Sequence, residues 1–523
     1  MKTTYDSATN SAPKDQQIAQ MAERIAVLEQ QLDWFKRQLF GRKSEKQFPE
    51  NPHQPGLFDT EHTETSPAAP ERQVQAYKRS AKKQRNDEDV TDEGLRFDDT
   101  VPQQIIEVAA PELTGDNADQ YEIIDYQETR RLAQRPGSYV VLVYRRPVVR
   151  HKPSQSLSEP AVPTNVLEGC YADVSLLAGL MVDKAVYHLP LYRQHRRMLD
   201  SGITLSRSTL INWLKKGIEL LRPIYQAQWR HILQSKVLAM DEVPMKAGLK
   251  KGAGRQPGQM KQTYFWPIYG EQDEVAFTWS PGRGMQHAKN QLANFSGTLL
   301  TDGYAAYSKA VNQLNEQERQ IIHANCWAHT RRTFEKALKM EPEAAQQALD
   351  YIAALYRHEK PILDKQLTLS QIREHRLKHS EPLVNNFFCW LYRQRQRTDL
   401  LPSNPLSKAL LYAHEREAQL RVFLANPAVP VDTNHLERAL RVIPMGRKNH
   451  LFCWTEIGAE QLGILQSLMV TCRLQGVNPY HYLVDVLQRI SLHPAKDALD
   501  LTPRVWKDKF KGNFLTSDLA QMG

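Results

Sequence analysis

The stretches that decide the fold are Val237-Leu238-Ala239-Met240-Asp241 and Thr298-Leu299-Leu300-Thr301-Asp302. Each is a short apolar run, typical of a buried β-strand, and each ends in an aspartate. Between them lie two more strand-like runs, at residues 263–269 and 274–279, and a helix-like stretch at residues 286–295. Because functional groups in α/β sheets gather where strands end, the two aspartates are candidates for a common site.

The order of these elements predicts an α/β fold with an RNase H-like core, in which three strands, a helix and a fourth strand follow one another. The pattern then requires a third acid from a later helix. Glu437, in Asn434-His435-Leu436-Glu437-Arg438-Ala439-Leu440-Arg441, is the best candidate. The apolar residues around it recur at helical spacing, so Glu437 lies off the centre of a buried stripe. Pro444 is expected to end this helix.

Asp241, Asp302 and Glu437 are therefore predicted to be the catalytic and metal-binding carboxylates. Phosphodiester transfer places charge on an attacking and a leaving oxygen, and two divalent ions about 4 Å apart stabilise both. Mg²⁺ prefers hard oxygen ligands, which two aspartates and a glutamate supply, and Mn²⁺ is an alternative. The competing interpretation is structural, because an aspartate after a strand is often a turn former and Asn434 with Glu437 also fits a capping box.

Length and composition restrict the class of protein. The 523 residues are enough for about two to four domains. No apolar run approaches the roughly 20 residues needed to cross a bilayer, and the N-terminus has no apolar signal segment. The five cysteines are scattered and form no C-x-x-C pair, which argues against a disulfide framework or a structural zinc finger. A cytoplasmic protein that does not enter the membrane is expected.

Basic residues cluster along the chain, whose net charge is +9. Three clusters are predicted to contact DNA, since each phosphate contact is favoured by counterion release. A solvated basic face is the alternative for any one cluster. The predicted DNA-binding residues in these clusters are Arg145, Arg146, Arg150, Arg193, Arg207, Ser208, Arg438, Arg441, Arg447 and Lys448.

The N-terminal half divides into four predicted segments. Residues 1–45 carry an unbroken heptad that favours a coiled coil and self-association over a helix docked on its own core. Its a and d positions are Ile18, Met21, Ile25, Leu28, Leu32, Phe35 and Leu39. Residues 46–98 are predicted to be a flexible linker, and residues 99–155 a small β-containing module with a basic edge. Residues 165–232 show a helix, a glycine turn and a second helix, which is the pattern of a DNA-reading helix-turn-helix. Plain helix packing is the alternative for that pattern.

Several motifs together resemble the insertion-sequence 66 family of bacterial transposases, of the TnpC type. The resemblance covers most of the chain. Its motifs here are Leu39-Phe40-Gly41-Arg42-Lys43-Ser44-Glu45, Tyr187-His188-Leu189-Pro190-Leu191-Tyr192-Arg193-Gln194, Leu205-Ser206-Arg207-Ser208-Thr209-Leu210, Met240-Asp241-Glu242-Val243-Pro244, Thr301-Asp302-Gly303-Tyr304-Ala305-Ala306-Tyr307, Cys326-Trp327-Ala328-His329-Thr330-Arg331-Arg332, and Asn434 to Arg441 followed by Gly446-Arg447-Lys448-Asn449.

The resemblance implies further assignments. It places the metal on Asp241 rather than Glu242, and strand alternation argues against both acids binding the same ion. Arg331 and Arg332 become candidates for DNA contact. His323, Cys326 and His329 are too few and too close for a closed zinc site. The family's cysteine-containing zinc module has no counterpart in cysteines here, since residues 100–152 contain none, so no zinc is expected.

The remaining domain boundaries follow from the resemblance. Residues 233–339 form the first part of the RNase H-like core, residues 340–430 an all-helical insertion, residues 431–455 the second part with the Glu437 helix, and residues 456–523 a C-terminal helical segment.

The predicted function is that of a bacterial insertion-sequence transposase. Its partners would be double-stranded DNA, namely element-end inverted repeats and target DNA, a second copy of the chain in a homodimer or higher oligomer, and accessory transposition proteins. Two alternatives stand beside it, an RNase H-like DNA nuclease and a DNA-binding protein that has lost catalysis.

Overall fold

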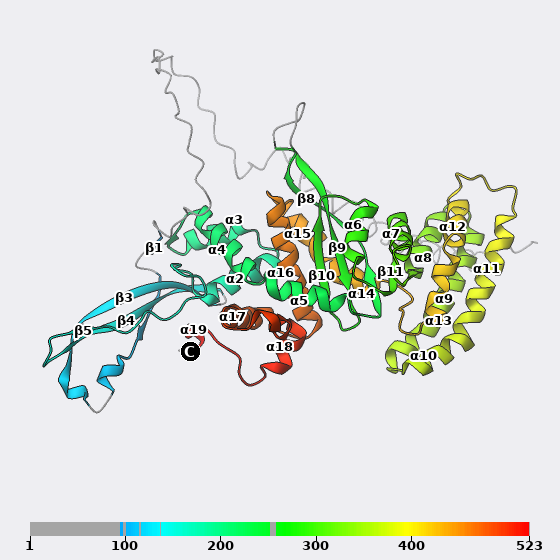
Figure 1. Ribbon diagram of the computed structural model, residues 1–523. Helices are drawn as coiled ribbons and strands as arrows, with labels where there is room; N and C mark the ends of the chain where they lie inside the picture. Colours follow the sequence, from blue (N-terminus) through cyan, green and yellow to red (C-terminus); the bar gives the residue numbers. More distant parts are fainter. Residues whose placement is uncertain (1–94, 98–100, 115–116, 136, 251–257, 522–523) are drawn as a thin grey trace, which may run out of the picture. The chain divides into compact units, whose positions relative to one another are not determined.

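The computed structural model describes residues 95–97, 101–114, 117–135, 137–250 and 258–521 (Figure 1). The chain divides into two units, Met1–Lys83 and Gln84–Gly523, and the described residues all belong to the second. The predicted heptad of residues 18–39 and nearly all of the predicted linker, apart from residues 95–97, therefore lie outside the described residues. No helix among the described residues is long and apolar enough to cross a membrane.

A mixed six-stranded sheet forms the centre of the described unit. Its strands are β7 (Val237–Met240), β8 (Val243–Leu249), β9 (Met260–Tyr269), β10 (Val275–Ser280), β11 (Gly297–Thr301) and β12 (Ile321–Asn325). They lie in the order β10-β9-β7-β11-β12, with β8 also paired to β9. The first strands are antiparallel, whereas β11 is parallel to both β7 and β12. This order and these directions fit an RNase H-like core.

Strands β7 and β8 are two parts of one line of chain along β9. Met240 lies opposite Ile268 and Val243 lies opposite Phe265, so the register does not change and Asp241 faces Pro267. The Asp241 N–H donates to the Pro267 carbonyl over 3.3 Å, but proline has no N–H to return. The ladder is interrupted at the residue that ends the predicted first strand. The sequence pattern missed β8, which continues the strand beyond this interruption.

Helices cover both faces of the sheet. On one face, α6 (Met285–Leu292) and α7 (Ala305–Asn315) pack on Leu238, Met240 and Leu299. On the other, α14 (Asn434–Leu440) and α16 (Glu456–Leu474) pack against alternate residues of β8, among them Val243 and Met245. The glutamate helix is thereby fixed over the strand that ends in Asp241.

The helix of Glu437 ends earlier than Pro444. Helix α14 stops at Leu440, and α15 (Val442–His450) begins two residues later with Pro444 in its first turn. The expectation that Pro444 ends the helix is wrong. In a first turn the backbone N–H has no helical partner, so a proline costs little there.

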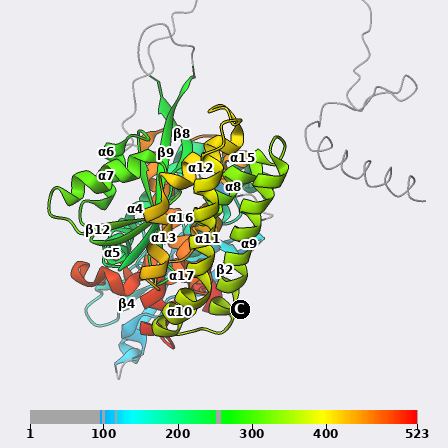
Figure 2. The same cartoon turned by 90° about the vertical axis from the view of Figure 1, so that its right-hand side faces the viewer.

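A group of helices separates the two parts of the core in sequence and has its own apolar core. Figure 2 shows these helices packed side by side, and their core includes Phe387, Phe388 and Leu410. They are α9 (Pro342–Asp364), α10 (Leu369–His375), η4 (Arg376–Ser380), α11 (Glu381–Arg395), α12 (Pro405–His414) and α13 (Glu417–Ala425). We call residues 342–425 the helical region. Helix α8 (Trp327–Ala337) joins it to the sheet through Trp327.

The N-terminal part of the described chain combines a sheet with a helical bundle. Strands β2 (Gln103–Glu107), β3 (Tyr121–Arg135), β4 (Ser138–His151) and β5 (Leu157–Ser158) form the sheet. A short pair, β1 (Arg96–Phe97) and β6 (Ile203–Thr204), lies apart from it. The helices are α2 (Val174–Ala185), α3 (Leu191–Asp200), α4 (Arg207–Leu220) and α5 (Arg222–Ile232).

Two C-terminal helices, α17 (Pro479–Arg489) and α18 (Pro503–Lys509), share one apolar core with this bundle and with α16. The short elements η2 (Pro111–Leu113), η3 (Ala118–Gln120), η5 (Ala495–Leu501) and α19 (Asp518–Gln521) complete the fold.

A buried ion pair fixes the helical region at η4. Arg376 donates to both carboxylate oxygens of Glu359, at 2.9 and 2.7 Å, and to the backbone carbonyls of Phe423, Pro427 and Val429. The two side chains are only 4% and 8% exposed.

We expect Arg376→Ala to lower the free energy of unfolding by about 3–5 kcal/mol, because it leaves the Glu359 carboxylate buried without a partner. Urea denaturation followed by circular dichroism measures the change. Asp399→Asn removes a partner of Arg397 from an exposed pair in the same region and serves as the control, with little or no effect expected. Equal effects of the two substitutions would show that the buried pair does not stabilise the region.

Candidate metal centre

Three carboxylates meet at one edge of the central sheet. Asp241 directly follows β7 and Asp302 directly follows β11, and these strands are parallel neighbours with Leu300 opposite Ala239. Their carboxyl ends therefore reach the same edge. The side chain of Glu242 joins them, and oxygens of the three carboxylates lie within 4.8 Å of one another. Among the described residues, this is the group of acids, histidines and cysteines that could hold a metal ion.

The spacing creates strong repulsion between negative charges. The pKa of the Asp241 carboxyl is raised to about 8, first by burial and then by the charges of Glu242 and Asp302. Burial also raises the pKa of Glu242, opposed by hydrogen bonds from Tyr307 and Arg283. A bound cation would remove this repulsion and favour the ionised forms. Carboxylate oxygens are hard ligands of the kind that Mg²⁺ and Mn²⁺ prefer, so the donor set fits such an ion.

We expected strand alternation to keep the side chains of Asp241 and Glu242 apart, but it does not. Glu242 does turn to the α6–α7 face, where the Tyr307 hydroxyl donates to it over 2.5 Å and Arg283 forms an ion pair with it. At the edge of the sheet, however, its longer side chain still ends close to the two aspartates. The two adjacent acids are near enough for a common ion.

Glu437 lies beside this group but outside it. Its Oε2 atom pairs with Arg332 Nη2 at 2.5 Å, and its Oε1 atom is 3.7 Å from His329 Nε2. Oε1 is buried and accepts no hydrogen bond. Glu437 is still close enough for its charge to contribute to the raised pKa of Asp241. A buried oxygen that accepts no hydrogen bond is available to a ligand.

The capping interpretation of Glu437 does not hold. Thr433, not Asn434, precedes the first turn of α14, and its side chain makes no capping hydrogen bond. Asn434 instead donates from its side chain to Asp432 at 2.5 Å. The Glu437 carboxylate is turned towards α8, where Arg332 and His329 lie.

The helical region holds the loop that carries Asp302. The Tyr412 hydroxyl donates to the backbone carbonyl of Asp302, and Arg416 Nη2 donates to the carbonyl of Gly303 at 3.0 Å. Gly303 has φ +90°, and a Cβ atom there would lie 2.7 Å from both Tyr412 and Arg416. Glycine is required because of this backbone conformation and close approach. The Asp302 side chain accepts a hydrogen bond from the Tyr304 N–H at 2.8 Å.

His323, Cys326 and His329, which were considered as a zinc site, each contact a different partner. His323 Nε2 is 2.9 Å from Thr301 Oγ1, Cys326 Sγ accepts a hydrogen bond from the Thr433 backbone, and His329 faces Glu437. Burial lowers the pKa of His323 to about 4, so this imidazole is neutral near pH 7. His323 and Cys326 thus connect β11, β12 and the start of α14.

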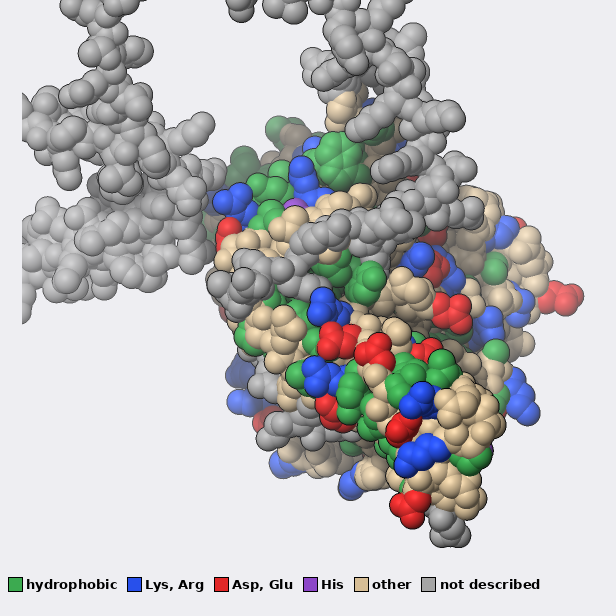
Figure 3. Space-filling view, turned by 90° about the vertical axis from the view of Figure 1, so that its left-hand side faces the viewer, with side chains coloured by type: hydrophobic (Ala, Val, Ile, Leu, Met, Phe, Trp, Pro, Cys, Tyr) green, Lys and Arg blue, Asp and Glu red, His purple; other side chains and the backbone are tan. Residues whose placement is uncertain are grey.

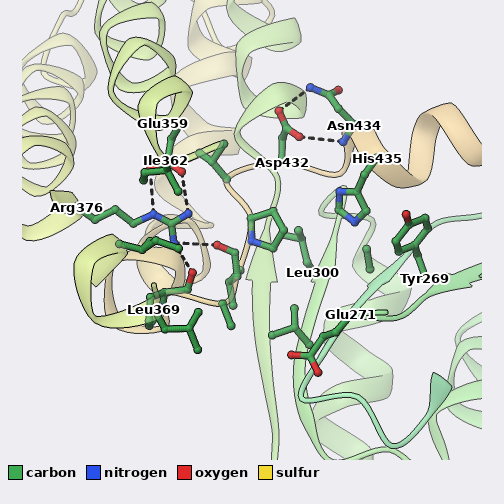
Figure 4. Close-up of a pocket in the computed structure, with 18 of the residues that line it drawn as sticks. Tyr269, Glu271, Leu300, Glu359, Ile362, Leu369, Arg376, Asp432, Asn434 and His435 are labelled. Atoms are coloured by element: carbon green, nitrogen blue, oxygen red, sulfur yellow. Dashed lines mark hydrogen bonds and ion pairs between the residues drawn. The ribbon is translucent and has the colours of Figure 1, made fainter. Parts of the chain in front are cut away.

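A cavity of about 730 Å³ lies between the sheet and the helical region. Figure 4 shows Tyr269 and Leu300 on the sheet side, Glu359 and Arg376 on the helical side, and His435 from α14. None of the residues that line it is one of the four acids described above.

The predicted DNA-binding arginines of the β-sheet module are paired within it. Arg145 lies 3.4 Å from Glu128, Arg150 pairs with Glu122, and Arg146 is buried and donates to the Pro160 carbonyl at 2.9 Å. In Figure 3, where this side of the molecule faces the viewer, basic and acidic side chains are interspersed. These contacts give Arg146 a structural part in the module, and contact of this group with DNA stays a prediction.

The other predicted DNA-binding residues lie on helices. Arg193 is exposed on α3, and Arg207 and Ser208 begin α4, with Arg207 over the Tyr192 ring. Arg331 and Arg332 lie on α8, where they pair with Glu335 and Glu437 respectively. Arg438 lies on α14, Arg441 lies between α14 and α15, and Arg447 and Lys448 lie on α15. Arg447 donates to the Pro244 carbonyl at 2.6 Å.

Two residues around the carboxylates, Tyr307 and Arg283, were not identified from the sequence as parts of this site. Glu242 had been considered as a metal ligand and set aside in favour of Asp241, and His329 had been considered within the zinc trio. Tyr307 follows Asp302 by five residues at the end of a first helical turn, which was an available signal. Arg283 precedes α6 and carries no local pattern that marks it.

Family models match three parts of the chain. The model for "Transposase IS66 family" matches residues 169–461, the model for "IS66 C-terminal element" matches residues 467–503, and that for "Transposase C of IS166 homeodomain" matches residues 27–93. Among curated proteins, the chain is similar to uncharacterized proteins y4qI and y4jD of Sinorhizobium fredii. It is 28% identical to y4qI over 77% of this chain and 75% of that protein, and 29% identical to y4jD over 63% and 64%.

Similar solved structures include the Drosophila P element transposase strand transfer complex, at 10% identity and a TM-score of 0.21. That match covers 68% of this chain and 86% of the other. The Mos1 transposase paired-end complex with left transposon end matches at 14% identity and a TM-score of 0.14, over 34% and 64%. Likenesses at this level support no conclusion about this chain.

The raised pKa of Asp241 predicts a stability change with pH in the absence of metal. Its folded pKa of about 8 lies above the unfolded value of about 3.9, so the folded state loses stability as pH rises between them. Asp241→Asn removes this cost. In EDTA, we expect the variant to melt above the wild type at pH 8.5, with a smaller difference at pH 5.5.

Added Mg²⁺ should raise the melting temperature of the wild type at pH 8.5 more than that of Asp241→Asn. Differential scanning fluorimetry measures both effects, with Asp399→Asn as the control for loss of one carboxylate elsewhere. Equal stabilisation of wild type and variant by Mg²⁺ would contradict the assignment of Asp241 to a metal site.

Proposed function

The chain belongs to the IS66 transposase family, and from this premise we propose that it cuts DNA at the ends of its own insertion sequence and joins those ends to target DNA. The observation that carries the proposal is the meeting of Asp241, Glu242 and Asp302 within 4.8 Å at the edge of the central sheet. Carboxylates at this spacing suit divalent-ion-assisted phosphodiester chemistry.

We assign the metal-binding role to Asp241 and Asp302, with Glu437 as the third carboxylate. Glu242 is a further candidate because it already lies in the group. When bound, Mg²⁺ or Mn²⁺ would supply Lewis-acid activation of the attacking oxygen and charge stabilisation at the leaving oxygen. The buried Oε1 of Glu437, which accepts no hydrogen bond, supports its assignment.

The chain's own residues would set the charge and position of the reacting groups. Arg332 neutralises Glu437 in this structure, and its 45% exposed side chain could pair with a DNA phosphate instead. Tyr307 and Arg283 hold Glu242, and Tyr412 with Arg416 hold the Asp302 loop. Water would attack the phosphorus at the element end and free a 3′-hydroxyl. That hydroxyl would then attack a target phosphodiester and displace one of its oxygens.

DNA contact is proposed for the exposed helical arginines and for the helix-turn-helix pattern of α3 and α4. Asp200 ends α3, Gly202 follows with φ +78°, and Ser206 caps α4 by accepting the Thr209 N–H at 3.0 Å. This geometry places Arg207 and Ser208 in the first turn of the second helix, where base-reading residues of such motifs lie. The match of residues 27–93 to a model described as a homeodomain region supports a DNA-contacting arm as well.

Self-association through the N-terminal heptad is proposed from its sequence alone, because those residues lie outside the described part of the chain. Two transposon ends require two active sites for a joint reaction, which an oligomer supplies. Accessory transposition proteins remain part of the proposal because of the resemblance to the family.

We expect Asp241→Asn and Glu437→Gln each to reduce Mg²⁺-dependent strand transfer by about 10³-fold, since loss of a metal ligand removes several kcal/mol of transition-state stabilisation. Purified protein, labelled element-end duplex and plasmid target, resolved on a denaturing gel, measure cleavage and joining separately. Asp399→Asn is the control.

Unchanged strand transfer in both variants would show that the carboxylate assignment is wrong. Cleavage of element ends without joining by the wild type would favour an RNase H-like nuclease. DNA binding without metal uptake, measured by titration calorimetry with Mn²⁺, would favour an inert DNA-binding protein.

A further inference from the structure

A mixed basic and apolar surface follows the Glu437 helix and has no part in the metal centre. Met445 on α15 is 50% exposed, and Leu451 and Trp454 in the loop to α16 are 64% and 68% exposed. The exposed cations Arg441 and Lys448 lie beside them. We call Arg441, Met445, Lys448, Leu451 and Trp454 the α15 surface. An exposed apolar patch with a polar rim marks an interaction site more often than apolar residues scattered singly do.

The fold holds Trp454 in a fixed, exposed position. The Cys453 N–H donates to the Lys246 carbonyl at 2.9 Å, and the Gly248 N–H donates to the Cys453 carbonyl at 3.1 Å, so the loop pairs with the edge of β8. Leu451 ends α15 with φ +60°, a conformation that a leucine rarely adopts. The Trp454 ring lies edge-on to Phe452, with centroids 5.0 Å apart. These contacts present the indole outwards at a fixed place.

Cations flank these apolar side chains, and the acid that follows them in sequence, Glu456, is paired with Lys261. Arg441, Met445 and Lys448 recur at helical spacing along one exposed face, with Met445 between the two cations. Lys246 is exposed on the strand that pairs with the loop. Among the described residues, none of these three cations takes part in an ion pair with an acid. A surface of unpaired cations around an exposed indole complements the phosphates and base faces of DNA.

Strand β8 sets the distance between the α15 surface and the metal centre. Cys453 pairs with residues five to seven positions after Asp241 on the same line of chain, which is about 17–23 Å at about 3.3 Å per residue. A DNA duplex advances by about 3.4 Å per base pair, so that span is about six base pairs. A duplex with its cleaved phosphate at the carboxylates and its axis along β8 would therefore pass the α15 surface.

We propose that the α15 surface holds the element-end duplex about six base pairs from the cleaved phosphate. Arg441 and Lys448 contact phosphates, and Trp454 with Leu451 presses against a base step and partly unstacks it, as apolar wedges do in proteins that kink DNA. This rests on the proposed function. A protein partner is an outcome of the test, because tryptophan, methionine and arginine are also enriched at protein interfaces.

The test uses the full chain and a duplex that carries the terminal inverted repeat of its element. Separate duplexes place 2-aminopurine near the sixth base pair from the cleaved end and at a distant internal position. Wild type should raise fluorescence at the first position only, because unstacking relieves quenching. Trp454→Ala should lose this signal and bind about tenfold to hundredfold more weakly by anisotropy. Trp454→Phe should retain part of both.

Two matched controls distinguish unstacking by Trp454 from a general loss of DNA binding. Leu401→Ala changes a leucine of similar exposure, 69%, in the helical region and should leave binding and fluorescence unchanged. Lys448→Ala should reduce the slope of log affinity against log salt by about one, whereas Trp454→Ala should leave that slope unchanged.

The inference is overturned if Trp454→Ala binds and unstacks the duplex as the wild type does, or if it instead lowers the oligomer mass in sedimentation. Failure of the proposed function has a different signature, which is wild-type protein that binds the duplex with the expected Trp454 dependence but neither cleaves nor joins it in Mg²⁺. Wild-type protein with no affinity for the duplex would contradict both.

Discussion

Electrostatic repulsion among carboxylates at one edge of the sheet is the constraint on which the rest of the structure depends. Burial raises the pKa of Asp241 to about 8 together with the charges of Glu242 and Asp302, which lie close to it, and Glu437 adds to the effect. Such a group persists only where surrounding contacts fix each member. Pro267 interrupts the strand ladder at Asp241, Tyr307 and Arg283 hold Glu242, and Arg332 holds Glu437. Once a cation is bound, its attraction to the carboxylates outweighs their mutual repulsion.

The helical region contributes to this arrangement despite its distance in sequence. Tyr412 and Arg416 hold the backbone at Asp302 and Gly303, and Arg416 stacks on the Tyr412 ring at 4.0 Å. The Trp327 indole N–H donates to the Leu420 carbonyl at 2.9 Å, which joins the helix of His329 and Arg332 to the same region. Movement of the helical region would therefore be felt at Asp302 and at Glu437. This gives a physical reason for a large helical segment between the second and third predicted carboxylates.

The sequence allowed the two aspartates to be placed because each follows a buried apolar run, and the strand order was implied by the succession of elements. Strand β8 was missed since Pro244, Lys246 and Gly248 leave no continuous apolar run within it. Glu437 was chosen as the best acid on a later helix, and its assignment depended more on the family motif than the assignments of the two aspartates did. The pairing of Arg332 with Glu437, and of Arg145 and Arg150 with acids across neighbouring strands, joins residues far apart in the chain. A pattern of local charge cannot show such pairs.

Anomalous diffraction from crystals of the full chain with element-end DNA and Mn²⁺ tests the metal-centre account most directly. The account predicts manganese peaks in contact with the carboxylates of Asp241 and Asp302, with Glu437 or Glu242 completing the ligand set. It also predicts the 3′ end of the element strand beside them. Manganese bound elsewhere, with Asp241 and Asp302 free of any ion while the DNA end is in place, would contradict it.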